Sequence, residues 1–324
     1  MRTILISTVI SVALLALLFF FTSNFSLVLI AVLLALLEIT LSLDNAVVNV
    51  KALTGMSLIW QKRFLYFGLP IAVFGMRLIF PIVMVSLTTP LSFTEVIQVA
   101  IHDPKTYSHA LHDGMPLISG FGGSFLLMVF FSFFVEKFPL KNWAKLAFPL
   151  LIVLAIGVGM TASLAFRMDF FWAYLWGALI NFAFHGLQVI SKGLKKPQER
   201  KHLHPFLRSF ISTGLLGFLY LEVLDASFSF DGVLGAFAIT QNIFVIMIGL
   251  GIGALFVRSF TMWMLDNRTL QKWAYLDDGA HYAVLFLGVC ILGENFYPVP
   301  EFLIAFVSVF IIGVSMLLSR IKVF

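Results

Sequence analysis

Five acidic side chains interrupt two apolar stretches of the sequence. The first stretch carries Glu38 and Asp44, and the second carries Glu222, Asp225 and Asp231. A carboxylate at the membrane centre costs about 2.5–3.5 kcal/mol on insertion scales, so five of them cost about 12–17 kcal/mol. Neither packing nor topology requires a cost of that size. We therefore interpret these acids as part of a functional site.

The two stretches carry the same motif. The segments 38–45 and 225–232 both read acid, x, hydroxyl, x, Ser, x, Asp, followed by Asn45 in the first and Gly232 in the second. On a continuous helix, residues two apart point in different directions, so the polar side chains of each motif would not share a face. Local unwinding near Ser42–Asn45 and Ser229–Gly232 would bring them to one side, and Gly232 would ease the second break. The alternative is two straight helices whose acids pair with Lys51, Arg77 or Arg258.

Oxygen ligands dominate both motifs. Carboxylate, amide, hydroxyl and backbone oxygens make a hard site that suits magnesium, calcium or manganese. The same carboxylates could also take up protons, because desolvation and mutual repulsion raise their proton affinity. We therefore predict a transported divalent cation rather than a permanently bound cofactor. The predicted metal ligands are Asp44, Asp231, Glu38, Asn45, Asp225 and Glu222.

The composition is that of a membrane protein. Of the 324 residues 60% are hydrophobic and only 11% are charged, and the mean hydropathy is +1.02. Such a chain predicts an all-α, polytopic transmembrane helical bundle, here a single integral membrane domain over residues 1–324. The net charge of +5 is spread over short loops, so the expected surroundings are a lipid bilayer and not nucleic acid. The single cysteine, Cys290, excludes an intramolecular disulfide.

Ten apolar segments predict ten membrane spans. The first, although it follows Arg2, lacks a small-x-small cleavage site and is read as a retained helix instead of a signal peptide. The segments lie near residues 3–21, 25–50, 64–87, 117–135, 146–166, 169–190, 209–235, 240–260, 280–293 and 302–319.

Basic residues in the loops predict the orientation. Lys and Arg collect on the cytoplasmic side of membrane proteins, and the loop after the sixth segment holds six of them. When spans are counted in both directions from that loop, every other strongly basic loop lies on the cytoplasmic side. We therefore expect a multi-pass protein of the cell membrane with both termini cytoplasmic.

An internal repeat is visible around the acidic motifs. The second and seventh segments must cross the membrane in opposite directions. After them, 68–77 parallels 249–258 with Gly, Leu, Ile and Arg at equal offsets, and 111–114 parallels 276–279. We predict an inverted repeat of three-helix units, spans 2–4 and 7–9, an organisation in which transporters place their site near the midplane. The predicted parts are repeat 1 (25–135), connecting helices and a basic loop (136–208), repeat 2 (209–293) and a final helix (294–324).

A polar stripe marks the sixth segment. Asn181, His185 and Gln188 follow i, i+4, i+7 spacing and lie on one helix face. Hydrogen bonding between helices is the simpler interpretation, and lining of a pathway is the alternative.

Two short sequences resemble the TerC family of integral membrane proteins. They are Leu-Ser-Leu-Asp44-Asn45-Ala-Val and Ser229-Phe-Asp231-Gly232-Val, and the resemblance covers roughly residues 25–135 and 205–320. It implies a TerC-like membrane fold of repeated three-helix units and an activity in manganese export or metal homeostasis in the bacterial inner membrane. The family's motif acids then correspond to Glu38, Asp44 and Asp231, and its following Asn to Asn45. Gly232 replaces a frequent Asn, and Glu222 and Asp225 are additional acids.

We therefore expect an exporter of a divalent cation, with manganese favoured and calcium or magnesium as alternatives. A second hypothesis is a non-transporting membrane scaffold of a stress-resistance or metalation complex. An enzyme is not expected, because no Gly-x-Gly-Asp, His-Glu-x-x-His or Gly-x-Ser-x-Gly sequence occurs. The sequence is compatible with a homo-oligomer.

Overall fold

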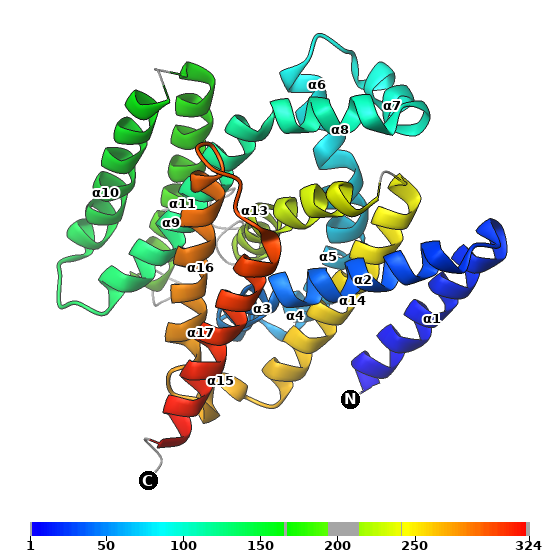
Figure 1. Cartoon of the computed structure of the whole chain (residues 1–324). Coiled ribbons are helices and arrows are strands. Elements are labelled where there is room, and N and C mark those ends of the chain that lie inside the picture. Colours follow the sequence, from blue (N-terminus) through cyan, green and yellow to red (C-terminus); the bar gives the residue numbers. More distant parts are fainter. Residues whose placement is uncertain (1, 165–166, 194–213, 241, 322–324) are drawn as a thin grey trace.

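Long apolar helices make up most of the computed structural model, which describes residues 2–164, 167–193, 214–240 and 242–321 (Figure 1). No strand occurs in those ranges. Helices satisfy their own backbone hydrogen bonds, which is the requirement for a segment surrounded by lipid. The prediction of an all-α, polytopic membrane bundle is confirmed.

Each of the ten predicted spans falls on a helix or a bent pair of helices. Within the described residues, six helices are long and apolar enough to span a membrane: α1 (Arg2–Thr22), α9 (Met115–Glu136), α11 (Met168–Gly193), α14 (Ile243–Asp266), α16 (Leu276–Gly293) and α17 (Glu301–Ile321). Two bent pairs raise the number to eight. The first pair is α2 (Phe25–Leu41) with α3 (Leu43–Thr54), and the second is α4 (Leu58–Tyr66) with η1 (Ile71–Ile79) and α6 (Phe80–Thr88).

The two remaining predicted spans are α10 and α13. Helix α10 (Asn142–Ser163) has an apolar part of only 17 residues, Ala147–Ser163. Helix α13 (Leu215–Ile239) is long enough but carries three acids, Glu222, Asp225 and Asp231. Its polarity thus comes from the predicted site itself.

Helix packing is reciprocal between the two predicted repeats. Helix α2 packs against α14, and α13 packs against η1; α3 packs against α16, and α13 also packs against α9. In the predicted repeat, α2 and α3 correspond to α13, η1 to α14 and α9 to α16. The contact of α2 with α14 therefore corresponds to that of α13 with η1, and the contact of α3 with α16 corresponds to that of α13 with α9. A twofold relation requires such pairs of contacts. The superposition of the two units stays a prediction.

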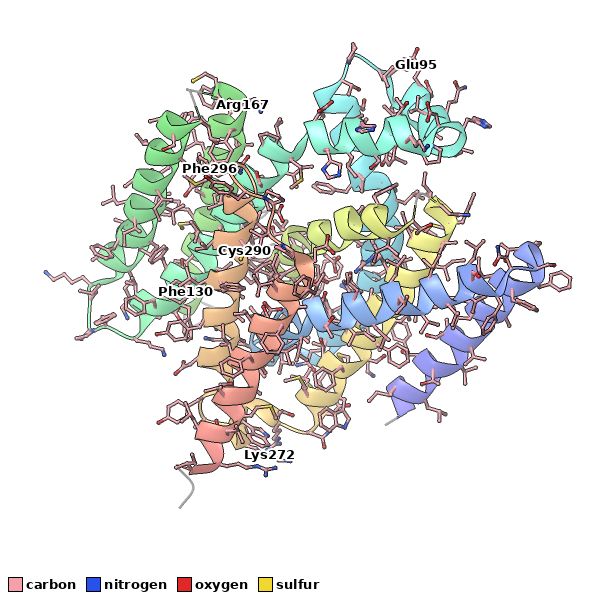
Figure 2. All side chains as sticks on the ribbon, viewed as in Figure 1. Glu95, Phe130, Arg167, Lys272, Cys290 and Phe296 are labelled. Carbon is pink, nitrogen blue, oxygen red and sulfur yellow. The ribbon has the colours of Figure 1, made fainter. Side chains whose placement is uncertain are left out.

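The outer connection between the third and fourth predicted spans is helical. Helices α7 (Phe93–His102) and α8 (Pro104–Asp113) lie at the top of Figure 1, while α1 begins and α17 ends in its lower half. Figure 2 shows Glu95 and Arg167 at the same upper edge and Lys272 at the lower edge. The predicted topology requires this separation, and the orientation itself stays a prediction.

Candidate functional site

The first acidic motif contains a helix break at one residue, Ser42. Helix α2 ends at Leu41, α3 begins at Leu43, and the two are bent by 53°. The Ser42 N–H donates to the Glu38 carbonyl oxygen at 3.0 Å, and the Ser42 hydroxyl donates to Glu38 Oε1 at 2.9 Å. The unwinding predicted over Ser42–Asn45 is confined to Ser42, because Leu43, Asp44 and Asn45 already belong to α3.

The second acidic motif has no such break. Helix α13 continues through Ser229–Gly232, so the unwinding predicted there is wrong. Gly232 serves a different purpose, because a Cβ at this position would lie 2.8 Å from Glu38 Oε2. The glycine permits a close approach between the two motifs and does not interrupt the helix.

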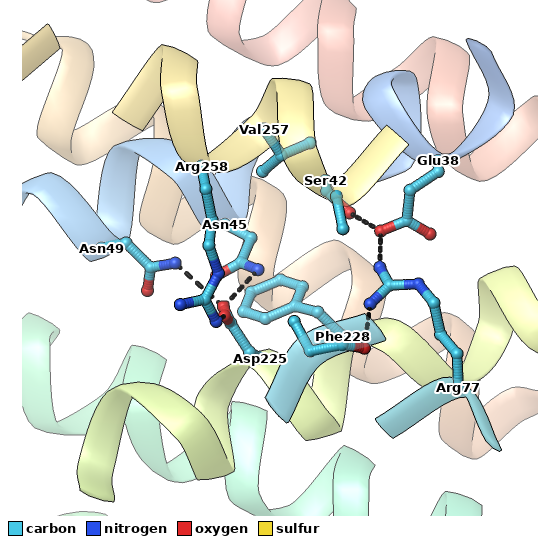
Figure 3. A pocket seen from close by; sticks show the side chains of 11 residues that line it. Glu38, Ser42, Asn45, Asn49, Arg77, Asp225, Phe228, Val257 and Arg258 are labelled. Carbon is cyan, nitrogen blue, oxygen red and sulfur yellow. Dashed lines mark hydrogen bonds and ion pairs between the residues drawn. The ribbon is translucent and has the colours of Figure 1, made fainter. Parts of the chain in front are cut away.

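A small cavity lies between the motifs (Figure 3). Its volume is about 20 Å³, which is room for one water molecule or one dehydrated ion. We call it the central cavity. Its lining residues are Glu38, Ser42, Asn45, Asn49, Ala72, Arg77, Asp225, Phe228, Ala254, Val257 and Arg258.

One ion pair in the central cavity joins Glu38 to Arg77. Their side chains are only 3% and 4% exposed. Arg77 Nη2 donates to Glu38 Oε1, and Arg77 Nη1 donates to the carbonyl oxygen of Ala72 at 2.5 Å. Arg77 belongs to the π-helical segment η1, which follows the short helix α5 (Gly68–Pro70). Pro70 removes a backbone donor, and π-helical turns often occur at functional sites.

The second ion pair joins Arg258 to two acids. Arg258 Nη2 donates to Asp225 Oδ2 at 2.7 Å and to Glu222 Oε1 at 3.5 Å. Asp225 Oδ1 accepts hydrogen bonds from Asn45 Nδ2 at 2.8 Å and from Asn49 Nδ2 at 2.9 Å. Asp225 therefore connects its own arginine to the first motif.

The two ion pairs occupy equivalent positions in the aligned sequences. Glu38 aligns with Asp225, and Arg77 aligns with Arg258. The pairing of acids with arginines, which the alternative interpretation predicted, is confirmed for these four residues. Its straight first helix is wrong, because α2 and α3 are bent by 53°. It is wrong for Lys51, which pairs with Asp277 and with neither motif.

Several buried oxygen atoms around this site accept no hydrogen bond within the described part of the chain. They are Asn45 Oδ1, Asn49 Oδ1, Asp44 Oδ2 and Glu222 Oε2. An ionised carboxylate only accepts hydrogen bonds, so Asn45 and Asn49 turn their amide nitrogens toward Asp225. Their amide oxygens therefore have no partner among the described residues. If all are ionised, the four buried acids Glu38, Asp44, Glu222 and Asp225 exceed the two arginines by two negative charges. A divalent cation would satisfy both the charge and the oxygens.

The structure brings together three of the six predicted ligands, Glu38, Asn45 and Asp225. Glu222 contacts Arg258 but does not line the central cavity. Asp44 is fully buried in the first turn of α3, where its Oδ1 accepts the Asn45 N–H at 2.9 Å. The prediction that Asp44 lies on the same side as the other polar residues of its motif is wrong. The helix resumes after Ser42, so successive side chains point about 100° apart.

The side chain of Asp231 lies outside the described residues, so its predicted role stays a prediction. Among the described side chains, no group of three or more His, Cys, Asp or Glu residues is placed to hold a metal. A cation in the central cavity would therefore depend on amide and hydroxyl oxygens as well as on carboxylates.

Two features escaped the sequence interpretation. Asn49 is one, although it follows Asn45 at the i+4 spacing of a shared helix face. The other is Glu294, which lies between α16 and α17 with its Oε2 buried and without a partner in the described residues. Burial raises the pKa of Glu294 to about 7. Glu301, at the start of α17, is close enough to interact with it electrostatically.

Two larger cavities, each about 500 Å³, flank the central cavity. The first is largely apolar, lies between α7, α8, α13 and α14, and shares Arg77 with the central cavity. The second has both polar and apolar side chains in its lining and lies among α3, α9, α11 and α13. Asn181, His185 and Gln188 line it, so the stripe on α11 faces a cavity.

Fold and site together define a polytopic helical membrane protein with a buried, charged centre. The chain belongs to the family described as Protein of unknown function (DUF475), which matches residues 43–323. The match includes both arginines and the whole second motif, while Glu38 precedes it. Neither a curated protein nor a solved structure matches the chain.

Proposed function

We propose that this protein is a membrane transporter that exports a divalent cation through the central cavity. The observation that carries the proposal is the pair of amides, Asn45 and Asn49, that donate to the Asp225 carboxylate through Nδ2 while their Oδ1 atoms have no partner within the described residues. Oxygen ligands and surplus negative charge select a hard cation. Manganese is favoured by the resemblance to the TerC family, with calcium and magnesium as alternatives.

The arginines act as internal counter-ions in this proposal. A central cavity of about 20 Å³ admits an ion only after it loses its water shell. Arginine does not release its proton at physiological pH, so Arg77 and Arg258 must shift away from Glu38 and Asp225 when a cation takes their place. Alternating access in repeat-built transporters is largely a rocking of one repeat against the other, and the exchange of arginine for cation would accompany it here.

Proton uptake is assigned to the acids next to the central cavity. Asp44 and Glu222 are buried, and each has one oxygen without a partner in the described residues. Protonation would remove their charge when no cation is bound. Asp44→Asn and Asp231→Asn are each predicted to stop manganese efflux while leaving membrane insertion intact, because an amide is cheaper to bury than a carboxylate.

The second hypothesis is a non-transporting scaffold of a stress-resistance or metalation complex. It predicts that substitutions at the central cavity leave cellular metal unchanged. The sequence has no long polar segment for docking soluble partners, which favours transport.

Manganese flux into vesicles containing the purified full-length protein tests the proposal. Asp225→Asn keeps the volume of the side chain and removes its charge, so we expect the initial rate to fall at least about tenfold. The matched control is Asp169→Asn, which removes a partly exposed acid paired with Arg167 at 2.5 Å and does not line the central cavity. The control should transport like the unmodified protein. Equal flux in Asp225→Asn and Asp169→Asn would contradict the proposal.

A further inference from the structure

The largely apolar cavity between α7, α8, α13 and α14 has the size of a ligand site. We call it the apolar cavity. Its volume is about 500 Å³, and pockets that hold one organic molecule measure about 300–1,000 Å³. An apolar cavity of about 150 Å³ holds benzene and stays dry, so a cavity of this size holds roughly 20 carbon atoms by proportion. One fatty acyl chain has about that number of carbons.

The mouth of the apolar cavity lies among apolar side chains that face outward. Phe244, in the first turn of α14, is 61% exposed, and Ile101 on α7 is 54% exposed; both line the cavity. In a membrane bundle such side chains face lipid. Helices α7 and α8 belong to the outer connection at the top of Figure 1, so the predicted topology places the mouth at the outer membrane surface. The molecules that reach this mouth are therefore membrane lipids.

Tyr107 on α8 provides a hydrogen-bond donor that lacks an acceptor. Its side chain is 3% exposed and lines the apolar cavity, and its ring centroid lies 5.6 Å from that of Phe237. The Tyr107 hydroxyl forms no hydrogen bond within the described residues. A buried tyrosine hydroxyl usually has a partner. The cavity wall is too apolar to hold a water with its two to four polar contacts, so the acceptor is expected from a ligand.

The charge distribution favours a neutral acceptor on that ligand. Among the described residues that line the apolar cavity, Arg77 is the one charged side chain. Its guanidinium donates to Glu38 and to the Ala72 carbonyl oxygen in the central cavity, so its charge is already compensated. Asn242, at the mouth, accepts through Oδ1 from the Phe244 N–H at 3.1 Å, and its Nδ2 remains a donor. Two neutral donors and no free charge match an ester carbonyl group and not an acidic headgroup.

We propose that the apolar cavity binds one acyl chain of a membrane glycerolipid, with the ester carbonyl oxygen of that chain accepting from the Tyr107 hydroxyl. The chain extends from the mouth toward Arg77, and the headgroup stays at the outer membrane surface. Lipid tails are as apolar as the cavity wall, so the hydrogen bond sets the preference for this site over the surrounding bilayer. The inference goes beyond the proposed transport function and does not depend on it.

Competition between two lipids with the same chains tests the site. The probes are dioleoyl phosphatidylcholine, which has ester carbonyl groups, and its diether analogue, which lacks them. The purified full-length protein is loaded from detergent micelles that contain equal amounts of both, and native mass spectrometry counts the lipids that each chain retains. We expect one retained lipid per chain and an ester-over-ether preference of about fivefold, the effect of one hydrogen bond.

Two tyrosine variants separate the hydrogen bond from packing. Tyr107→Phe keeps the ring and removes the hydroxyl, so the preference should disappear while the unfolding temperature in lipid-free detergent does not fall. The matched control is Tyr174→Phe, because Tyr174 is 1% exposed, donates to the Val153 carbonyl oxygen at 2.7 Å and does not line the apolar cavity. This control should keep the fivefold preference and lower the unfolding temperature, since it leaves a buried carbonyl without its donor.

Filling the apolar cavity tests its occupancy. Ala100 is buried and lines the cavity, so Ala100→Phe should remove most of the retained lipid of either linkage. If Ala100→Phe is poorly folded, the comparison of Tyr107→Phe with Tyr174→Phe decides alone, because Tyr107→Phe removes a single atom that has no partner in the described residues.

The outcomes distinguish this site from the proposed function. An equal retention of ester and ether lipid by the unmodified protein, or an unchanged preference in Tyr107→Phe, would overturn the lipid site, whatever Asp225→Asn does to manganese flux. No metal is used in the lipid assay. Loss of the preference in Tyr107→Phe alone therefore supports the lipid site even if Asp225→Asn transports like the unmodified protein and the transport proposal is wrong.

Discussion

The two buried ion pairs stand at equivalent positions of the repeated motifs but are built differently. Glu38 lies in α2, which ends at the break at Ser42, and its partner Arg77 lies in a π-helical segment. Asp225 and Arg258 lie in the regular helices α13 and α14. The acid–arginine pairing is shared, whereas the local helix geometry is not. The pairing therefore does not depend on a broken helix.

The difference indicates where the molecule can move. Arg258 holds two acids and the Phe64 carbonyl oxygen at 2.7 Å, and Asp225 also accepts from two asparagines. Arg77 holds one acid and one carbonyl oxygen. Helix breaks and π-helical segments are common hinges, since they lack part of the regular hydrogen-bond ladder. We infer that, in the proposed transport, Arg77 leaves Glu38 more readily than Arg258 leaves Asp225.

Removing the arginines should give the largest effects on stability. Arg258→Met leaves Asp225 and Glu222 without their cation, and breaking a buried pair costs about 3–5 kcal/mol. Arg77→Met should cost less, because it leaves one acid, Glu38, without its cation instead of two. Thermal unfolding in detergent measures both. Adding Asp225→Asn to Arg258→Met should restore part of the lost stability. Equal losses of stability in Arg258→Met and Arg77→Met would contradict the inferred difference between the two ion pairs.

A methyl group at Gly253 tests the packing around Glu38. A Cβ there would lie 2.5 Å from Glu38 Cβ and 2.9 Å from the Ala35 carbonyl oxygen. We expect Gly253→Ala to lower the free energy of unfolding by about 1–3 kcal/mol through overpacking. The control is Gly159→Ala on α10, where no atom lies within 4 Å. That control should be neutral or stabilise by up to about 1 kcal/mol, since alanine favours helix.

The hydroxyl at the helix break should give a smaller effect. Ser42→Ala removes the hydrogen bond to Glu38 Oε1 and should lower the free energy of unfolding by about 1 kcal/mol. Ser227→Ala, on the unbroken helix, removes only a bond to the Val223 carbonyl oxygen of its own helix. It should change stability by less than about 0.5 kcal/mol. A larger loss at Ser227 than at Ser42 would show that the break is not supported by this hydroxyl.

The sequence predicted the helices well because apolar runs of membrane length leave few alternatives. It also identified Glu38 and Asp225, since an acid in such a run is costly. The spacing within the motifs was misread. Polar residues at every second position suggested unwinding, but Glu38, Ser42, Asn45 and Asn49 follow i, i+4, i+7, i+11 and share one helix face.

The remainder depends on tertiary structure. Glu38 and Arg77 are 39 residues apart, and Asp225 and Arg258 are 33 apart, so pairing could only be one of several alternatives. The contacts from Asn45 and Asn49 to Asp225 cross between the repeats. The unequal sizes of the central cavity and of the larger cavity among α3, α9, α11 and α13 follow from how the helices pack, which no local pattern encodes.

A double-mutant cycle of manganese affinity tests most directly whether both motifs form one site. It compares the unmodified protein, Glu38→Gln, Asp225→Asn and the double variant by equilibrium Mn²⁺ binding. We predict that each single substitution weakens Mn²⁺ binding at the central cavity at least about tenfold, or about 1.4 kcal/mol, and that the double variant is weakened by clearly less than the product of the two effects. Strictly multiplicative losses, or no loss in either single variant, would contradict a single central cation site.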